Sequence, residues 1–203
     1  CNWEAIDKHT TTIVTQNESS AVLKHTLDST EYYITLHWEG EATLNEKVKH
    51  CFVLTPMDDK LAFTCAFTSE APSTQIVTVE QIQEEAKNYW NSFWKEGAAV
   101  DFSSCTDSRA KELERRVVLS QYLLAIQSAG TTPPQETGLT YNSWFGKFHL
   151  EMIWWHEAQF ALWNRSKLLD RTLAWYEKAE PIARQIAQRQ GFDGVRWMKM
   201  TDP

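Results

Sequence analysis

The sequence predicts an α+β fold in which an antiparallel β-sandwich portion comes first and helices follow. Short apolar alternations broken by polar turns fill residues 10–79, and from Val79 onward apolar residues recur at helical spacing. The chain has 203 residues, of which 42% are hydrophobic and 23% charged, as is usual for a folded globular protein. The change of period near residue 80 therefore predicts an α+β chain or two separate domains.

The first part of the chain has the residue types of half-buried strands. β-Branched and aromatic residues are frequent there, and turn-forming residues at 16–20 and 56–60 separate the alternating stretches. Their roughly regular spacing predicts an antiparallel sheet or half of a β-sandwich. The expected strands are Thr11–Thr15, Ala21–Leu23, Tyr32–Trp38, Val48–Leu54, Leu61–Phe67 and Gln75–Val79.

Four helices are expected after residue 80. The first has an apolar face and stops before a glycine, the second begins at an Asp or Ser cap, and the last passes a proline as a kink or as the start of a new helix. The third has apolar side chains nearly all the way round, which predicts burial on most faces by neighbouring helices. Their expected ranges are Glu80–Lys95, Ser108–Ser128, Leu150–Asn164 and Ser166–Gln190.

Charge and hydropathy exclude several classes of partner. The net charge is −7 and the longest charged run with basic residues is Glu114–Arg116, so neither nucleic acid nor an anionic membrane surface is an expected partner. No run approaches the roughly 20 apolar residues of a membrane span. A neutral substrate agrees better with this composition.

The four cysteines show no metal-ligand spacing, and no cofactor or metal is expected. Cys51 and Cys65 lie in strand-like stretches that could pair as a hairpin. A cross-strand disulfide is one reading, and two buried free thiols are the other.

Residues 141–163 combine aromatic rings with two histidines and two carboxylates, which indicates sugar binding. Aromatic faces stack on the apolar face of a pyranose, and carboxylates and imidazoles hydrogen-bond its hydroxyls. Core packing of the tryptophans, and histidines that are hydrogen-bonded within a buried helix, would produce the same pattern. A later loop near residue 197 could form another wall of the pocket. The candidate substrate-binding residues are Trp144, Phe145, His149, Glu151, Trp155, His156, Trp197 and Asp202.

Four segments resemble the six-hairpin glycosidase superfamily, which includes the phosphorylases of glycoside hydrolase family 65. They are Tyr89–Trp94, Glu112–Gln127, Trp144–His156 and Gly191–Pro203. The resemblance implies a β-sandwich over residues 1–79, a linker helix and loop over 80–105, and the start of an incomplete α/α six-hairpin barrel over 106–203. It also implies that the general acid and the remaining barrel helices lie beyond Pro203, so that this chain is an N-terminal portion.

The function expected from these observations is that of part of a carbohydrate-active enzyme, a glycoside hydrolase or phosphorylase, that contributes the sugar-binding wall. A non-catalytic carbohydrate-binding protein is the alternative, and a helical interaction module is a third. Glycoside hydrolysis needs two carboxyl groups across the scissile bond, and no persuasive pair is evident. Glu151 is the best single catalytic candidate, although hydrogen bonding to the sugar is its other role. A periplasmic or extracellular location is expected, with the cytoplasm as the alternative.

Overall fold

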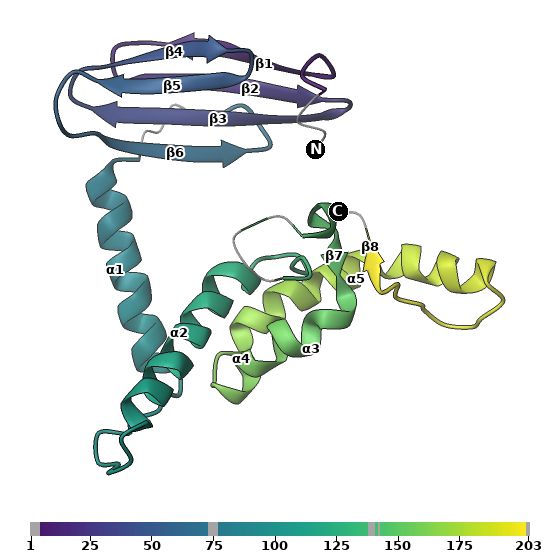
Figure 1. Cartoon of the computed structure of the whole chain (residues 1–203). Coiled ribbons are helices and arrows are strands. Elements are labelled where there is room, and N and C mark those ends of the chain that lie inside the picture. Colours follow the sequence, from purple (N-terminus) through teal and green to yellow (C-terminus); the bar gives the residue numbers. More distant parts are fainter. Residues whose placement is uncertain (1–4, 73–76, 138–140, 142, 202–203) are drawn as a thin grey trace. The chain divides into compact units, whose positions relative to one another are not determined.

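The computed structural model describes residues 5–72, 77–137, 141 and 143–201. Contacts divide the chain into two compact units, Cys1–Trp90 and Asn91–Pro203, and each is described by itself. Antiparallel sheets come first and helices follow, so the predicted α+β class is confirmed (Figure 1). Among the described residues, no helix has both the length and the apolar character needed to cross a bilayer.

The first unit contains two antiparallel sheets. Four strands form the larger sheet in the order β1-β2-β3-β6, and β4 and β5 form a hairpin (Figure 1). The expected alternation holds along β2, where Ala21 and Leu23 are buried and their neighbour Val22 is less so. The strands are β1 His9–Gln16, β2 Ser20–Leu27, β3 Thr30–Glu39, β4 Ala42–Val48, β5 Cys51–Pro56 and β6 Ala62–Thr68.

Both sheets contribute to one hydrophobic core. Leu23 of β2, Trp38 of β3 and Leu44 of β4 form its buried centre together with Ala21. Trp38 is the largest of these, and its indole N–H donates to the carbonyl of Glu18 at 3.0 Å. A buried tryptophan whose polar atom is satisfied contributes its full apolar area without an unpaired donor.

Two predicted strands differ from the structure. The stretch Val48–Leu54 is not one strand, because the chain turns at Lys49 and His50, with His50 in the left-handed region at φ 65°, and β5 then pairs with β4. In the stretch Gln75–Val79, Gln75 and Ile76 lie outside the described residues, and Val79 begins a helix.

The expectations for the cysteines are wrong. Cys51 lies in β5, which pairs with β4, whereas Cys65 lies in β6, which pairs with β3, so the two strands do not form a hairpin with each other. Both thiols are free, and both are exposed rather than buried. Neither the disulfide nor the alternative of buried thiols is therefore observed.

Three histidines meet in the first unit, His9 from β1, His25 from β2 and His50 from the turn between β4 and β5. The ring of His9 stacks on that of His50 with centroids 4.0 Å apart and lies 5.1 Å from that of His25. The Thr11 hydroxyl lies 2.8 Å from Nδ1 of His25 and 3.0 Å from Nδ1 of His50, and Nε2 of His50 lies 2.8 Å from the carbonyl of Ile6. A carbonyl only accepts, so Nε2 of His50 donates to Ile6. Nδ1 of a neutral His50 then accepts from the Thr11 hydroxyl, and the Thr11 oxygen accepts from Nδ1 of His25. These three side chains form the histidine cluster.

Three long helices agree with the sequence. They are α1 Val79–Glu96, α2 Ala110–Ser128 and α5 Ser166–Arg189, and Pro181 lies within α5. A capping box begins α1, because Thr78 N–H donates to Gln81 Oε1 at 2.9 Å and Gln81 N–H donates to the Thr78 hydroxyl at 3.3 Å. Gly191, at φ 80°, follows the end of α5.

The third predicted helix is broken. The segment consists of the short 3-10 turn η2 Leu150–Met152, α3 Ile153–His156 and α4 Ala158–Leu162, with a non-helical Glu157 at φ −128° and ψ −31° between the last two. Its apolar surface is also not buried on most faces, since Trp154 is 70% and Leu162 84% exposed. The predicted continuous, enclosed helix is therefore wrong.

Buried Arg165 joins α5 to the first helices of the second unit. Its guanidinium donates to the carbonyls of Phe93 at 3.0 Å and Ala98 at 3.2 Å and to Oε1 of Gln121 at 2.7 Å. It also lies 4.0 Å from the centroid of the Phe93 ring. A Cβ atom on Gly97 would lie 2.1 Å from Cζ of Arg165, so the close approach requires glycine.

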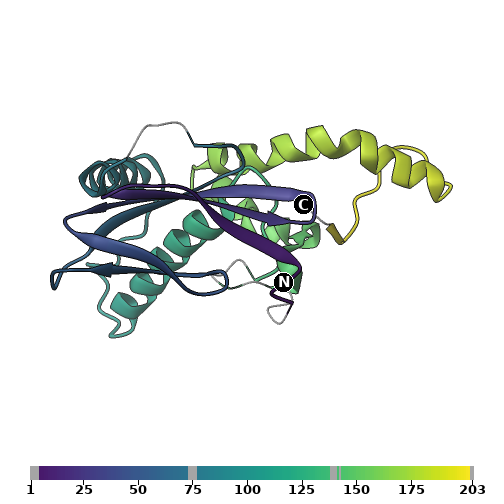
Figure 2. The ribbon, with the colours of Figure 1, turned by 90° about the horizontal axis from the view of Figure 1, so that it is seen from above.

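After α5 the chain doubles back along the helix (Figure 2). The amide of Phe192 donates to Ala187 at 2.9 Å, and that of Arg196 donates to Ala183 at 3.1 Å. The returning segment ends in β8 Met200–Thr201, which pairs with β7 Phe148–His149. This pairing fixes the segment around residue 150 beside α5.

Candidate functional site

A strained loop presents two aromatic rings to solvent. Trp144, Phe145 and Gly146, which form the short turn η1, have φ angles of 50°, 60° and 72°. Trp144 is 59% and Phe145 80% exposed. Left-handed conformations cost non-glycine residues on the order of 1–3 kcal/mol each and are concentrated at ligand-binding sites.

Hydrogen bonds hold this loop in place. The amide of Ser143 donates to Oε1 of Gln135 at 2.8 Å, and the amide of Gly146 donates to the carbonyl of Ser143 at 3.0 Å. The amide of Lys147 donates to the carbonyl of Trp144 at 3.2 Å. The strain is therefore maintained by contacts with the protein, and the two rings gain exposure instead of packing.

The second unit also contains a buried polar cluster, which consists of His149, His156, Glu157 and Tyr176. β7 places His149, whose amide donates to the carbonyl of Pro134 at 3.0 Å, and α3 places His156 seven residues further along the chain. Glu157 is 0% exposed. Within the described part of the chain, Nδ1 of both histidines, both carboxyl oxygens of Glu157 and the Tyr176 hydroxyl are buried and make no hydrogen bond.

So many unpaired polar atoms in one place are unusual in a folded protein. Buried side-chain polar groups are nearly always hydrogen-bonded, because each unpaired group costs on the order of 1–3 kcal/mol. Exceptions are concentrated where a ligand, water or a reaction uses the group. The described part of the second unit has other buried polar atoms without a partner, on Gln121, Ser128 and Glu136, but the buried polar cluster has the most of them and is therefore a candidate functional site.

Burial shifts the protonation equilibria of the cluster. It raises the pKa of Glu157 from 4.5 to about 7, and the nearby Thr172 hydroxyl offsets only part of this rise. The Thr172 hydroxyl donates to the carbonyl of Gly130 at 3.4 Å, and among the described residues it makes no hydrogen bond to Glu157. Burial is therefore the main cause of the raised pKa of Glu157. Burial, and then the charge of Glu157, raise the pKa of Tyr176 to about 12.

His156 shifts toward the neutral form. Burial is the largest cause that lowers its pKa, a hydrogen bond with the backbone of Glu136 opposes this, and the nearby His149 lowers the pKa further. Near neutral pH the cluster thus contains a neutral imidazole beside a carboxyl group that is poised between its two forms. Such a carboxyl group can both give and take a proton at that pH.

The remaining candidate residues from the sequence are Glu151, Trp155, Asp202 and Trp197. Glu151 is exposed, its amide donates to the carbonyl of Lys199 at 3.3 Å, and its carboxylate lies 3.5 Å from the Lys199 ammonium. The apolar enclosure that would suit a general acid is therefore absent at Glu151. Trp155 is 66% exposed and available for stacking. Asp202 lies outside the described residues.

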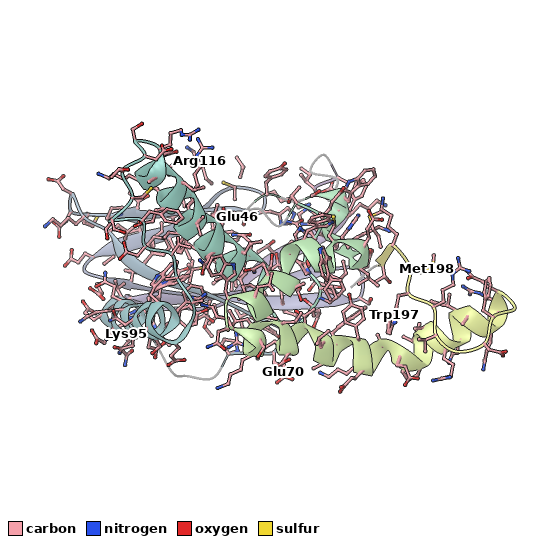
Figure 3. The ribbon with its side chains drawn as sticks, turned by 90° about the horizontal axis from the view of Figure 1, so that it is seen from below. Glu46, Glu70, Lys95, Arg116, Trp197 and Met198 are labelled. Atoms are coloured by element: carbon pink, nitrogen blue, oxygen red, sulfur yellow. The ribbon has the colours of Figure 1, made fainter. Side chains whose placement is uncertain are left out.

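Trp197 lies on the segment that returns beside α5, as Figure 3 shows for this residue and Met198. Its ring meets that of Tyr176 edge-on at 5.0 Å and lies 6.2 Å from that of Trp175. Trp197 also lines an apolar cavity of about 340 Å³ against α5. Trp197 therefore contacts Tyr176, a member of the buried polar cluster, and also lines the cavity.

The structure divides the predicted site. Trp144, Phe145, Glu151 and Trp155 are exposed, whereas His149 and His156 are buried. His149 lies in β7 and His156 in α3, so the two histidines do not share a face of one helix as the sequence predicts. Among the described residues, no ring contact joins Trp144, Phe145 and Trp155 to each other, so they are a set of exposed rings and not one pocket.

Sequence reasoning missed Glu157 and Tyr176 as members of the site. Glu157 follows His156 directly, and on the predicted helix it lies more than one turn from Glu151 and on another face, so the two do not form a carboxyl pair. The signal that could have found it is an ionisable residue within an otherwise apolar run, a combination that is costly unless it is paired or functional. Tyr176 carries no comparable signal, since α5 brings it to the cluster only in the folded chain.

No group of three or more histidine, cysteine, aspartate or glutamate side chains in the described ranges is arranged to hold a metal ion. Comparison of the chain with protein-family models, with curated proteins and with solved structures finds no match.

Proposed function

We propose that this chain is part of a carbohydrate-active enzyme, a glycoside hydrolase or phosphorylase, and that it contributes the sugar-binding wall of the active site. The observation that carries the proposal is the strained turn at Trp144 and Phe145, which exposes two large rings instead of burying them. Aromatic faces exposed at the cost of backbone strain are suited to stack on a flat ligand with apolar C–H faces. A pyranose is such a ligand.

The exposed residues have the complementary polar chemistry. Glu151 lies on the turn that follows β7, where its carboxylate, paired with Lys199, can accept hydrogen bonds from sugar hydroxyls. Trp155 adds a further exposed ring two residues beyond the start of α3. In this proposal Glu151 binds the sugar, and the catalytic carboxyl groups are not assigned.

The buried polar cluster supports this wall from behind. Glu157 is 0% exposed, so it does not touch a substrate and is a positioning residue in this proposal. His149 directly precedes η2, which carries Glu151, and His156 ends α3, which carries Trp155, and in this proposal the two buried histidines anchor these short elements.

The fold agrees with the six-hairpin resemblance in its order of elements. We propose that the two sheets of the first unit are part of a β-sandwich, a proposal that their shared core around Leu23, Trp38 and Leu44 supports. We further propose that helices of an α/α barrel cover the exposed apolar residues Leu119 and Ile126 of α2. A location outside the cytoplasm is proposed only from the polysaccharide-type ligand, since the Cys51–Cys65 bridge is absent.

The test is oligosaccharide binding by the chain and by Trp144→Ala. We expect calorimetry with gluco-, xylo- and manno-oligosaccharides to show one preferred series, and Trp144→Ala to weaken its binding by about 1 kcal/mol or more, which is fivefold or more. Phe63→Ala is the matched control, because Phe63 is also an exposed aromatic residue but lies on β6. Equal affinities of the two variants would contradict the proposal.

The non-catalytic alternative rests on one observation, which is that the exposed carboxylate of Glu151 is engaged by Lys199. Aryl glycosides separate the two functions. Turnover above background, or phosphorolysis when inorganic phosphate is added, supports the enzyme, whereas tight binding without turnover supports a carbohydrate-binding protein.

A further inference from the structure

The cavity beside α5 differs from a sugar site in its lining. Leu150, Trp175, Ile182, Ile186, Trp197 and Met198 supply apolar walls of a cavity of about 340 Å³, which is near the lower end for small-molecule sites. α5 forms one wall, and the segment that returns beside it, with Trp197 and Met198 labelled in Figure 3, forms the other.

The polar groups at this cavity are almost all hydrogen-bond donors. Lys178 and Arg196 contribute cations to the lining, and Thr201 contributes the one hydroxyl among the described lining residues. Lysine, arginine and tryptophan side chains donate and do not accept. A sugar, whose hydroxyls need acceptors as well as donors, is therefore poorly matched to this lining.

The charges of the lining residues also indicate a ligand other than a sugar. No aspartate or glutamate occurs among the described lining residues, although the whole chain has a net charge of −7. Within the described ranges Lys178 and Arg196 have no ion pair with a carboxylate, whereas Lys199, outside the lining, pairs with Glu151. The Arg196 guanidinium lies 4.8 Å from the centroid of the Phe192 ring, and the Arg196 backbone N–H donates a hydrogen bond to the carbonyl of Ala183. Among the described residues, the two cations at this apolar cavity thus have no carboxylate partner.

We propose that this cavity binds a small amphipathic carboxylate, with its alkyl or aryl body against Trp175, Ile182 and Trp197 and its carboxylate at Lys178 and Arg196. Burial of the apolar body supplies about 25 cal/mol per Å² removed from water. The carboxylate receives charge-assisted hydrogen bonds from both cations, and Arg196 can bind it through two parallel N–H groups. This site is separate from the proposed sugar wall and does not depend on it.

Calorimetry with octanoate and octanol tests the proposal, because the two ligands share an apolar body and differ in charge. We expect octanoate to bind with one-to-one stoichiometry and at least tenfold more tightly than octanol. Lys178→Gln with Arg196→Gln should bring the affinity for octanoate down to that for octanol. Lys167→Gln with Arg189→Gln, a matched change of two exposed cations on α5 outside the lining, should leave it within twofold.

A second variant addresses the apolar body. Ile182 is 62% exposed, so Ile182→Asp should fold. The substitution places a carboxylate at the cavity, and its repulsion of the ligand carboxylate should weaken the affinity for octanoate at least tenfold. Circular dichroism spectra that match the parent chain establish folding of each variant.

Several results would overturn the proposal. One is equal affinities for octanoate and octanol. Another is that the control pair of substitutions lowers the affinity for octanoate as much as Lys178→Gln with Arg196→Gln does. A third is that the chain dimerises through this face and the dimer binds neither ligand. Competition by an oligosaccharide that binds at Trp144 would show that the cavity belongs to the sugar site. Failure of oligosaccharides to bind anywhere would contradict the proposed function and leave the octanoate result standing.

Discussion

Replacing Glu157 by glutamine should stabilise the protein at alkaline pH and not at acidic pH. Burial raises the pKa of this carboxyl group from 4.5 to about 7, so the folded chain holds a proton that the unfolded chain releases between these pH values. The unfolded state then binds fewer protons, and the free energy of unfolding falls as the pH rises from 4.5 to 7. The shift of about 2.5 pKa units corresponds to about 3 kcal/mol.

Glutamine keeps the shape of the side chain and has no charge to bury. Below pH 4.5 the parent chain and Glu157→Gln should have similar free energies of unfolding, and at pH 8 the variant should be more stable by about 3 kcal/mol. Urea denaturation at a series of pH values, monitored by tryptophan fluorescence, measures the difference. Contributions from other titrating groups are present in both proteins and cancel in it.

Glu151→Gln is the matched control. Glu151 is exposed and its pairing with Lys199 is solvent-accessible, so its removal should change the free energy of unfolding by about 0.5 kcal/mol or less at pH 8. If Glu157→Gln follows the parent chain at every pH, then Glu157 is charged and satisfied in solution, and the description of the buried polar cluster is wrong.

Three further outcomes are expected. Arg165→Met should lower the free energy of unfolding by about 3 kcal/mol or more, because it leaves the carbonyls that Arg165 binds without donors, and Gly97→Ala should act in the same direction; thermal melts check both. Burial, and then the nearby His9 and His50, lower the pKa of His25, so the unfolded chain binds more protons than the folded chain below about pH 6.5. The free energy of unfolding should therefore fall as the pH falls below this value. His25→Gln should reduce this fall, which urea denaturation at pH 7.5 and 5.5 measures. Cys51 and Cys65 should both react with a thiol reagent in the folded protein without prior reduction; a thiol count that rises only after reduction would contradict the free thiols.

The sequence was sufficient for the order of elements and for most of their positions. Alternation of apolar residues located β2, β3 and β6, and helical periodicity located α1, α2 and α5 to within a few residues. These patterns are local, and burial on one face imposes them directly. The hairpin of β4 and β5 was misjudged because His50 reverses the chain in a left-handed conformation that carries no glycine signal.

The candidate site was harder to predict than the elements. The sequence places His149 and His156 on one face of a single helix, whereas His149 lies in β7 and only His156 lies in α3. The interruption at Glu157 could not be predicted, since glutamate is a good helix former and no proline or glycine is present. Tyr176 and Arg165 act through contacts with segments far away in the sequence, and local patterns do not report such contacts.

The most direct test of the sugar-binding proposal is to observe the tryptophan indole signals by NMR while an oligosaccharide is added. Trp144 and Trp155, both exposed, should shift in a saturable manner with a single affinity, and Trp144→Ala should weaken that affinity. Trp38, buried in the core of the first unit, should not move. Saturable shifts confined to Trp144 and Trp155 would agree with the account, whereas no shift at either residue across gluco-, xylo- and manno-oligosaccharides would contradict it.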